Sequence, residues 1–332
     1  MTTPAMNIGT DHSPSTNRVR AVGVKSYGGP EALEVVEVPV QQLGPGQVRV
    51  HARATAVSPT DTVIRSGAAS STGLPANVVD VPGMDVAGVL AEIGPGVETE
   101  LSVGDRVVAV VVPKDDHGAY RTDIVLPAAS VVAAPVNHDD FASSTLPMNG
   151  LTAWLTLEKL GLKPGQVLAV TGAAGTYGGY VVQLAKHRGL HVVADASEPD
   201  EETVRAFGAD EVVRRGDDVA ERIRALHPDG VDGLADGAVQ GEQILSAVKD
   251  DGRVVTVRGW KADGPRSITV RPVWVAFGAE RPEALSELVS LADEGVLSLR
   301  VADVVPSAEA STAHARLEAG GLRGRIVIDL TR

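Results

Sequence analysis

The sequence contains no cysteine, which excludes disulfide bonds and every metal site built on thiolates. Aromatic residues make up only 3% of the chain, so its cores must consist mainly of Val, Leu, Ile and Ala. No run approaches the roughly 18 uninterrupted apolar residues of a membrane-spanning helix. Residues 1–17 lack the basic start and apolar core of a signal peptide and predict a disordered tail. Together these absences predict a cytoplasmic protein.

Basic residues are also outnumbered by acidic ones. The chain has 30 Lys and Arg residues and 43 Asp and Glu residues, which gives a formal net charge of −13. Such a chain offers little to neutralise phosphates, so nucleic acids and anionic membranes are excluded as expected partners. At 332 residues the chain exceeds what one hydrophobic core usually serves, and two domains are expected.

The first part of the chain predicts a small β-barrel-like domain. Gly-Pro-Gly turns at residues 44–46 and 94–96 separate short apolar segments, and no long helical period appears there. Strands are predicted at residues 19–24, 34–38, 47–56, 86–93 and 106–112.

After Asn137 strands and helices alternate, which is typical of a parallel, doubly wound sheet. Helices are predicted at residues 141–160, 180–188, 201–207, 219–226, 241–249 and 281–294. Strands are predicted at residues 166–171, 191–195, 211–213, 233–235, 253–257 and 325–330. We expect the last strand to return to the first domain. The expected domains are therefore 18–135 with 278–332, and 136–277.

A glycine loop joins the first strand of the second domain to the helix that follows it. Its sequence is TGAAGTYGG at residues 171–179, a variant of the dinucleotide fingerprint with Ala173 in the first glycine position. Gly175 lets the backbone approach a pyrophosphate, Gly178 lets the helix pack on the strand, and the helix N-terminus offers free N–H groups. We therefore predict that Ala173, Ala174, Gly175, Thr176, Tyr177 and Gly178 bind a nicotinamide dinucleotide.

The residues after the next strand leave the choice between NAD and NADP open. Asp195 lies about 20 residues beyond Gly175, where a carboxylate would accept the ribose hydroxyls and repel a 2′-phosphate. Ser197 and Arg215 are candidate ligands of a 2′-phosphate in the same pocket. The alternative is that the acidic residues 198–202 only complement the start of the next helix.

Several segments carry a resemblance to the medium-chain dehydrogenase/reductase superfamily, and within it to the zinc-free quinone oxidoreductase branch. They include the glycine loop with its helix, and the segments VPGMDVAG (81–88), VGDRV (103–107), GLTAW (150–154), FGAD (207–210) and GLRGRIV (321–327). The resemblance implies a GroES-like β-barrel catalytic domain, a Rossmann domain, and a cleft between them for nicotinamide and substrate. It also implies a homodimer formed through the edge of the Rossmann sheet, and a place for Arg323 near the cofactor.

Zinc-dependent relatives use an early Cys and a later Gly-His-Glu motif, where this chain has Ser58 and Gly83-Met84-Asp85. The eight histidines show no ligand spacing either, so no metal site is predicted. The branch often carries Asn-Pro-x-Asp-Tyr, whereas residues 58–62 read SPTDT, and this change weakens the transfer of the usual substrate contacts. We interpret Asp61 as a residue that binds backbone N–H groups in its turn.

Without a metal to polarise an alcohol, the easier reaction is reduction of an acceptor activated by conjugation. We predict a zinc-independent, NAD(P)H-dependent oxidoreductase that transfers hydride to a small electrophile, either a quinone or an enone or enoyl double bond. The candidate catalytic hydrogen-bond donors are Ser58, Thr62, Tyr120 and Asn149, and Thr152 is a candidate cofactor contact. Two alternatives remain open: a metal-free alcohol or carbonyl oxidoreductase, and a cofactor-binding sensor without catalysis.

Overall fold

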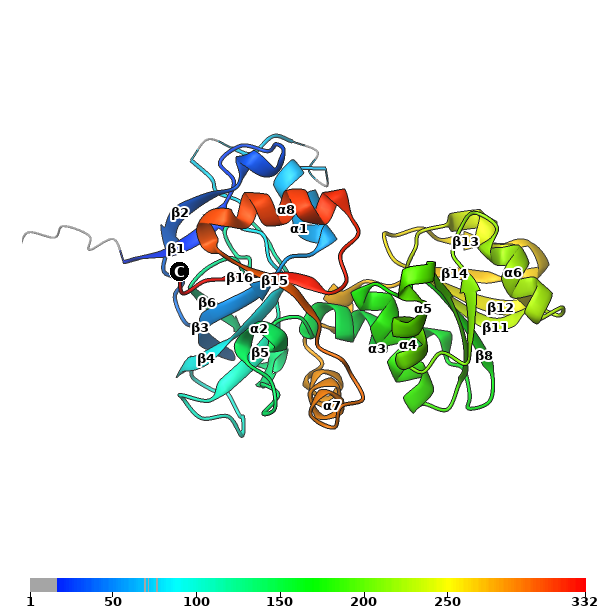
Figure 1. Ribbon diagram of the computed structural model, residues 1–332. Helices are drawn as coiled ribbons and strands as arrows, with labels where there is room; N and C mark the ends of the chain where they lie inside the picture. The colour runs from blue at the N-terminus through cyan, green and yellow to red at the C-terminus, as the bar shows by residue number, and fades with distance from the viewer. Residues whose placement is uncertain (1–16, 69, 71, 76) are drawn as a thin grey trace, which may run out of the picture.

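The structure is a computed structural model that describes residues 17–68, 70, 72–75 and 77–332. Apart from Asn17, the predicted tail lies outside the described residues. Two seven-stranded sheets form the two halves of the molecule, and α7 (Pro282–Asp293) packs between them (Figure 1). The expected fold class, a GroES-like barrel with a Rossmann domain, is confirmed.

The first sheet has the strand order β15-β16-β3-β4-β5-β7, with β6 also paired to β3. Its long strand β3 is antiparallel to three partners, β4, β6 and β16, so it connects the whole sheet. The bounds are β3 (Gln47–Ala56), β4 (Asp85–Ile93), β5 (Arg106–Val110), β6 (Asp123–Pro127), β7 (Val131–Ala133), β15 (Val301–Pro306) and β16 (Arg325–Asp329). A separate hairpin pairs β1 (Arg18–Gly23) with β2 (Glu34–Pro39).

Two helices cover this half of the molecule. The helix α8 (Ala310–Ala319) lies across it beside α1 (Pro59–Ser66), as Figure 1 shows. Neither helix is predicted from the sequence, because α1 is only two turns long and α8 has a weak apolar period. The pairing of β16 with β3 brings the end of the chain into the first sheet. The exact domain bounds stay predictions.

The second sheet has the order β10-β9-β8-β11-β12-β14-β13 and is parallel except for β13. The bounds are β8 (Val167–Thr171), β9 (His191–Ala196), β10 (Glu211–Arg214), β11 (Val231–Asp236), β12 (Val248–Thr256), β13 (Ala262–Asp263) and β14 (Thr269–Pro272). The chain moves outward from β8 on one side and then from β11 on the other. The β8/β11 boundary is thus the switch point at which such sheets bind ligands.

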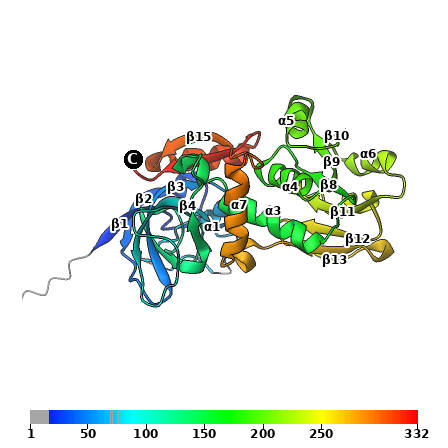
Figure 2. The ribbon, with the colours of Figure 1, turned by 90° about the horizontal axis from the view of Figure 1, so that it is seen from below.

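Strand periodicity divides the core of this half into two layers. Alternate residues of β8 pack against α3 (Pro147–Leu160) and α4 (Thr176–His187) on one side, and against α6 (Val219–Leu226) on the other. Figure 2 shows where these helices lie around the second sheet. The remaining helices are α2 (Asp140–Ser143) and α5 (Glu201–Ala206).

One predicted helix is wrong. Residues 241–247 form a 3-10 helix, and β12 begins at Val248, inside the helix expected at 241–249. Two backbone N–H groups of this segment, those of Gln240 and Gly241, donate to the buried Asp236 carboxylate, and Val248 pairs with Val231 of β11. These tertiary bonds override a local helical preference. Among the described residues, no helix is long and apolar enough to cross a membrane.

Candidate active site

A cleft of about 280 Å³ lies between the two halves, beside the switch point. One wall is the glycine loop with the start of α4, and the other is the segment from Leu317 to Ile326 that connects α8 to β16. Val57 and Pro59, at the start of α1, and Asn149 of α3 complete it. The cleft therefore combines residues that are up to 269 positions apart, between Val57 and Ile326.

The glycine loop has the geometry that a bound pyrophosphate needs. Helix α4 begins at Thr176, four residues earlier than predicted, so Thr176, Tyr177 and Gly178 form its first turn and leave their N–H groups without intrahelical acceptors. Gly175 precedes the helix and lines the cleft. A Cβ at Gly178 would lie 2.3 Å from the carbonyl oxygen of Gly172, so only glycine allows this packing. The loop fits a dinucleotide cofactor.

Three charged residues outside the motif hold the glycine loop. The Arg300 guanidinium donates to the carbonyl oxygens of Ala174 and Gly175, at 3.1 and 3.0 Å. Asp195 accepts the N–H of Ala173 at 3.0 Å, and Asp236 accepts the hydroxyl of Thr171 at 2.8 Å. Arg300 also adds positive charge next to the helix N-terminus, which favours an anion there.

Asp195 does not lie at the end of its strand. β9 ends at Ala196, one residue later than predicted, and successive side chains alternate between the faces of a strand. The Asp195 carboxylate therefore turns toward the glycine loop, where it is 4% exposed. Burial raises the pKa of Asp195, and the Ala173 N–H and the nearby Arg215 charge oppose that rise.

A second cavity of about 340 Å³ is lined by Asp195, Arg215, Gly216, Asp217 and residues of the loop 238–243. Arg215 is exposed, and its side chain makes no hydrogen bond or ion pair within the part of the chain that the structure describes. Ser197 donates its hydroxyl to Asp200, and Arg323 forms a two-point ion pair with the same carboxylate. This ion pair lowers the pKa of Asp200 and links the two halves of the molecule.

Other predicted cofactor residues take different positions. Tyr177 lines the cleft, and its hydroxyl lies 2.9 Å from that of Thr156. Asn149 also lines the cleft. Thr152 is 8% exposed and donates its hydroxyl to the carbonyl oxygen of Met148, one turn earlier. Ala173 and Ala174 are buried within the loop. The cofactor roles of these residues stay predictions.

The candidate donors of the first half are gathered around a buried carboxylate. Asp61 accepts the N–H groups of Ser58 at 2.7 Å and Gly83 at 3.1 Å, so the interpretation of Asp61 as a turn-binding residue is confirmed. Tyr120 donates its hydroxyl to Asp61 at 3.0 Å and lies 3.1 Å from Nε2 of His314.

Ser58, Asp61, Tyr120 and His314 are all fully buried. Thr62 is half-buried and donates to the Pro59 carbonyl oxygen. None of these side chains lines the cleft in this conformation, and their catalytic roles stay predictions.

The positions that carry zinc ligands in zinc-dependent relatives are used differently here. Asp85 forms a buried ion pair with Arg325 at 2.8 Å and accepts the N–H of Met148 at 2.6 Å, which ties β4, β16 and α3 together. Burial raises the pKa of Asp85, and the Arg325 charge opposes that rise. With Ser58 buried and Asp85 ion-paired, these positions do not provide three zinc ligands.

Sequence reasoning missed Arg300, Asp236 and His314 as parts of the site. Arg300 and His314 reach their partners from more than 120 residues away, so no local motif could reveal them. Asp236 could have been predicted from its position. It is the last residue of β11, the strand beside β8, and functional residues of parallel sheets often lie at the carboxyl ends of the strands.

Comparison with known proteins agrees with this geometry. Residues 44–139 match the family described as alcohol dehydrogenase GroES-like domain, and residues 207–328 match the family described as zinc-binding dehydrogenase. A 2-haloacrylate reductase from Burkholderia sp is 31% identical over 93% of this chain and 98% of its own length. The chloroplastic NADPH-dependent alkenal/one oxidoreductase of Arabidopsis thaliana is 31% identical over 77% of this chain and 66% of its own length.

Among solved structures, the quinone oxidoreductase from Coxiella burnetii superposes with a TM-score of 0.82, at 25% identity, over 94% of this chain and 99% of that chain. The same family is indicated by the relatives found by sequence, by the strand order and by the glycine loop. The chain belongs to the medium-chain dehydrogenase/reductase superfamily, in its quinone oxidoreductase-like branch, and is an NAD(P)H-dependent oxidoreductase.

Proposed function

We propose that the protein uses NADPH to reduce electron-poor C=C bonds conjugated to a carbonyl group, without zinc. The observation that carries this proposal is the lining of the cleft. Apart from Arg325 and Tyr177, its side chains are apolar, glycine, or the neutral Asn149, Thr176 and Pro59. Alcohol oxidation needs a base that takes up the hydroxyl proton or a Lewis acid that polarises the hydroxyl oxygen, and among the described residues no His, Asp, Glu or Lys lines the cleft.

Reduction of an unsaturated carbonyl compound does not need such a base or Lewis acid. NADPH held at the glycine loop would supply the hydride that the β-carbon accepts; negative charge would then develop on the carbonyl oxygen, and the α-carbon would take its proton from solvent. The protein must orient the reactants and place hydrogen-bond donors near that oxygen. We assign this role to the Asn149 amide. The names of the two sequence relatives, a haloacrylate reductase and an alkenal/one oxidoreductase, support this acceptor class.

Two features support NADPH over NADH. Asp195 lines the second cavity, but its carboxylate accepts the N–H of Ala173 at 3.0 Å, and this hydrogen bond reduces its repulsion of a 2′-phosphate. Arg215 lines that cavity with its guanidinium uncommitted among the described residues. An Arg–phosphate contact is a strong, charge-assisted interaction.

We also propose that the protein is a homodimer. Trp274 and Phe277 are 51% and 86% exposed, and they follow β14 near the edge of the second sheet. Large exposed apolar side chains at a sheet edge are typical of a subunit contact.

The activity is tested by following NADPH oxidation with enones, enoyl thioesters, quinones and saturated aldehydes, before and after EDTA treatment. We expect turnover of the first two classes, unchanged by EDTA, and a decrease in kcat/KM of at least about tenfold in Asn149→Ala. Turnover of aldehydes alone would favour a carbonyl oxidoreductase. Cofactor binding without any turnover would favour the sensor.

The cofactor preference is tested by dissociation constants for NADPH and NADH. Arg215→Gln should weaken NADPH binding by about 10- to 100-fold and leave NADH binding unchanged, because only NADPH offers the phosphate. The control is Arg214→Gln, since the neighbouring Arg214 is already paired with Glu198 at 2.9 Å. An equal loss for both cofactors in Arg215→Gln would contradict the proposal.

A further inference from the structure

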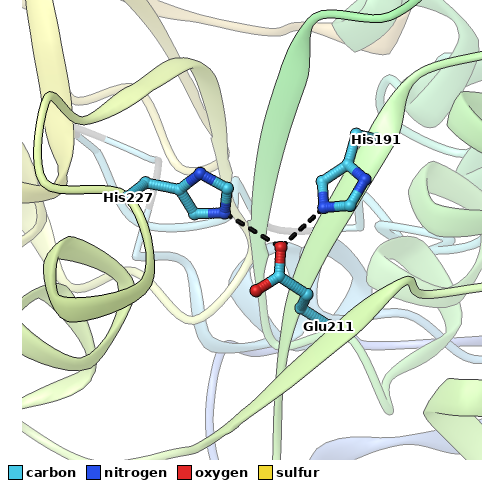
Figure 3. A group of neighbouring side chains, drawn as sticks. All are labelled: His191, Glu211 and His227. Carbon is cyan, nitrogen blue, oxygen red and sulfur yellow. Dashed lines mark hydrogen bonds and ion pairs between the residues drawn. The ribbon is translucent and has the colours of Figure 1, made fainter.

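We propose that His191, Glu211 and His227 form a binding site for one divalent transition-metal ion, with Zn²⁺ as the best-matched ion. Figure 3 shows both imidazole rings directed at the same carboxylate oxygen. Nε2 of His191 lies 2.6 Å, and Nε2 of His227 3.0 Å, from Oε1 of Glu211. It is the one group of three or more metal-binding side chains found among the described residues.

The three side chains come from three elements. His191 and Glu211 are the first residues of β9 and β10, and His227 directly follows the last turn of α6. Their side chains are 39%, 29% and 20% exposed, so an ion from solution can reach them. The sequence separations of 20 and 16 residues resemble no local metal motif, which is why sequence spacing predicted no metal here.

The donor set and its dimensions suit zinc. Two imidazole nitrogens and one carboxylate oxygen are donors that Zn²⁺ binds at about 2.0–2.1 Å, with a water molecule in the fourth position. Ligand atoms in such a tetrahedron are about 3.3 Å apart. The observed 2.6 and 3.0 Å need small side-chain rotations to open, and the partly exposed rings have room for them. Mg²⁺ and Ca²⁺ prefer oxygen ligands alone and fit less well.

The charges around the site also favour a cation. Oδ2 of Asp210 lies 3.6 Å from Nδ1 of His191, on the opposite side of the ring from Glu211, as in carboxylate–histidine–zinc arrangements. Asp210 is itself held by Lys186 at 2.8 Å and by the N–H of Val192 at 2.7 Å.

The site lies away from the cleft. The glycine loop and the second cavity adjoin the C-terminal ends of the parallel strands, whereas His191 and Glu211 stand at the N-terminal ends of β9 and β10. A bound ion would connect the edge strand β10 to β9 and α6. Its role is therefore to stabilise the second half of the molecule, and hydride transfer does not depend on it.

The experiment titrates ZnCl₂ into the EDTA-treated, desalted full chain by calorimetry and measures the melting temperature with and without Zn²⁺. We expect one ion per chain and a higher melting temperature. His227→Gln and Glu211→Gln should each weaken binding by at least about tenfold and remove the thermal shift.

The matched control is His51→Gln, which removes a surface histidine that pairs with a carboxylate, Asp123, in the other sheet. It should bind Zn²⁺ as the unaltered chain does. Absence of saturable binding to the unaltered chain, or equal binding by a well-folded His191→Gln/His227→Gln variant, would overturn the proposal. Loss of reductase activity has no bearing on this result, so the two proposals fail separately.

Discussion

At the scale of single residues, Asp61 and His314, which lie in one buried group with Tyr120, have pKa values that are shifted in opposite directions. Burial raises the pKa of Asp61 to about 6, against an ordinary value of 3.8. Burial, helped by the Arg65 charge, lowers the pKa of His314 to about 3, against 6.5. Between pH 4 and pH 6 the folded protein thus holds a proton on Asp61, while the unfolded chain holds one on His314.

These two effects on stability have opposite signs. The neutral His314 contributes stability above pH 6.5 that is lost as the pH falls toward 3. The neutral Asp61 contributes stability below about pH 4 that is lost as the pH rises through 6. Between pH 4 and pH 6 the two contributions to the free energy of unfolding change with pH by nearly equal and opposite amounts. The buried group therefore adds little pH dependence to stability in this interval.

The variant His314→Gln should reveal the cancellation, because it removes only the histidine contribution. We expect the difference in unfolding free energy, original protein minus variant, to rise by about 1.4 kcal/mol per pH unit between pH 4 and pH 6. Denaturant unfolding at several pH values measures it. A difference that stays constant with pH would mean that His314 is not held neutral.

At the scale of elements, Gly175 and Gly178 in the turn from β8 to α4 have different structural roles. A Cβ at Gly178 would meet only backbone atoms, Gly172 O at 2.3 Å and Ala173 Cα at 2.8 Å, which cannot move without shifting strand or helix. A Cβ at Gly175 would have one neighbour, Gly172 O at 3.2 Å, and would point into the cleft region that a pyrophosphate needs.

Substituting each glycine by alanine should separate folding from binding. Gly175→Ala should leave the melting temperature nearly unchanged while it weakens cofactor binding by at least about tenfold, since a methyl group displaces the phosphate from the loop. Gly178→Ala should weaken binding and also destabilise the fold by about 1–3 kcal/mol. Thermal unfolding and calorimetric titration with NADPH measure both. Tight binding by Gly175→Ala would show that the phosphates lie elsewhere.

At the scale of the whole molecule, two ion pairs lie where the two halves meet. The buried Asp85–Arg325 pair joins β4 to β16 within the first sheet, and Asp85 also accepts the N–H of Met148 at the start of α3. The Asp200–Arg323 pair links the two halves directly. Both arginines belong to one short segment, GLRGR at residues 321–325, and most of this segment also lines the cleft. The apolar Trp274 and Phe277 lie outside the cleft lining.

The proposed homodimer is tested by Phe277→Asp. A charge at the most exposed of the large apolar side chains should abolish dimerisation, because burying an unpaired carboxylate in an interface is costly. Light scattering with size-exclusion chromatography measures the mass, and NADPH affinity should stay the same. If the variant keeps the mass of the original protein, the subunit contact is not at Phe277.

The sequence by itself determined the two-part fold and the glycine loop, because both follow from local patterns: strand and helix periods, turn residues, and glycines at set spacing. It could not determine that the Asp195 carboxylate binds the Ala173 N–H, because that contact depends on how β9 lies beside the glycine loop. Only the tertiary structure brought Arg300 to the glycine loop, His314 to Tyr120, and His227 to Glu211. Such contacts join residues from distant elements, and packing of the whole chain decides them.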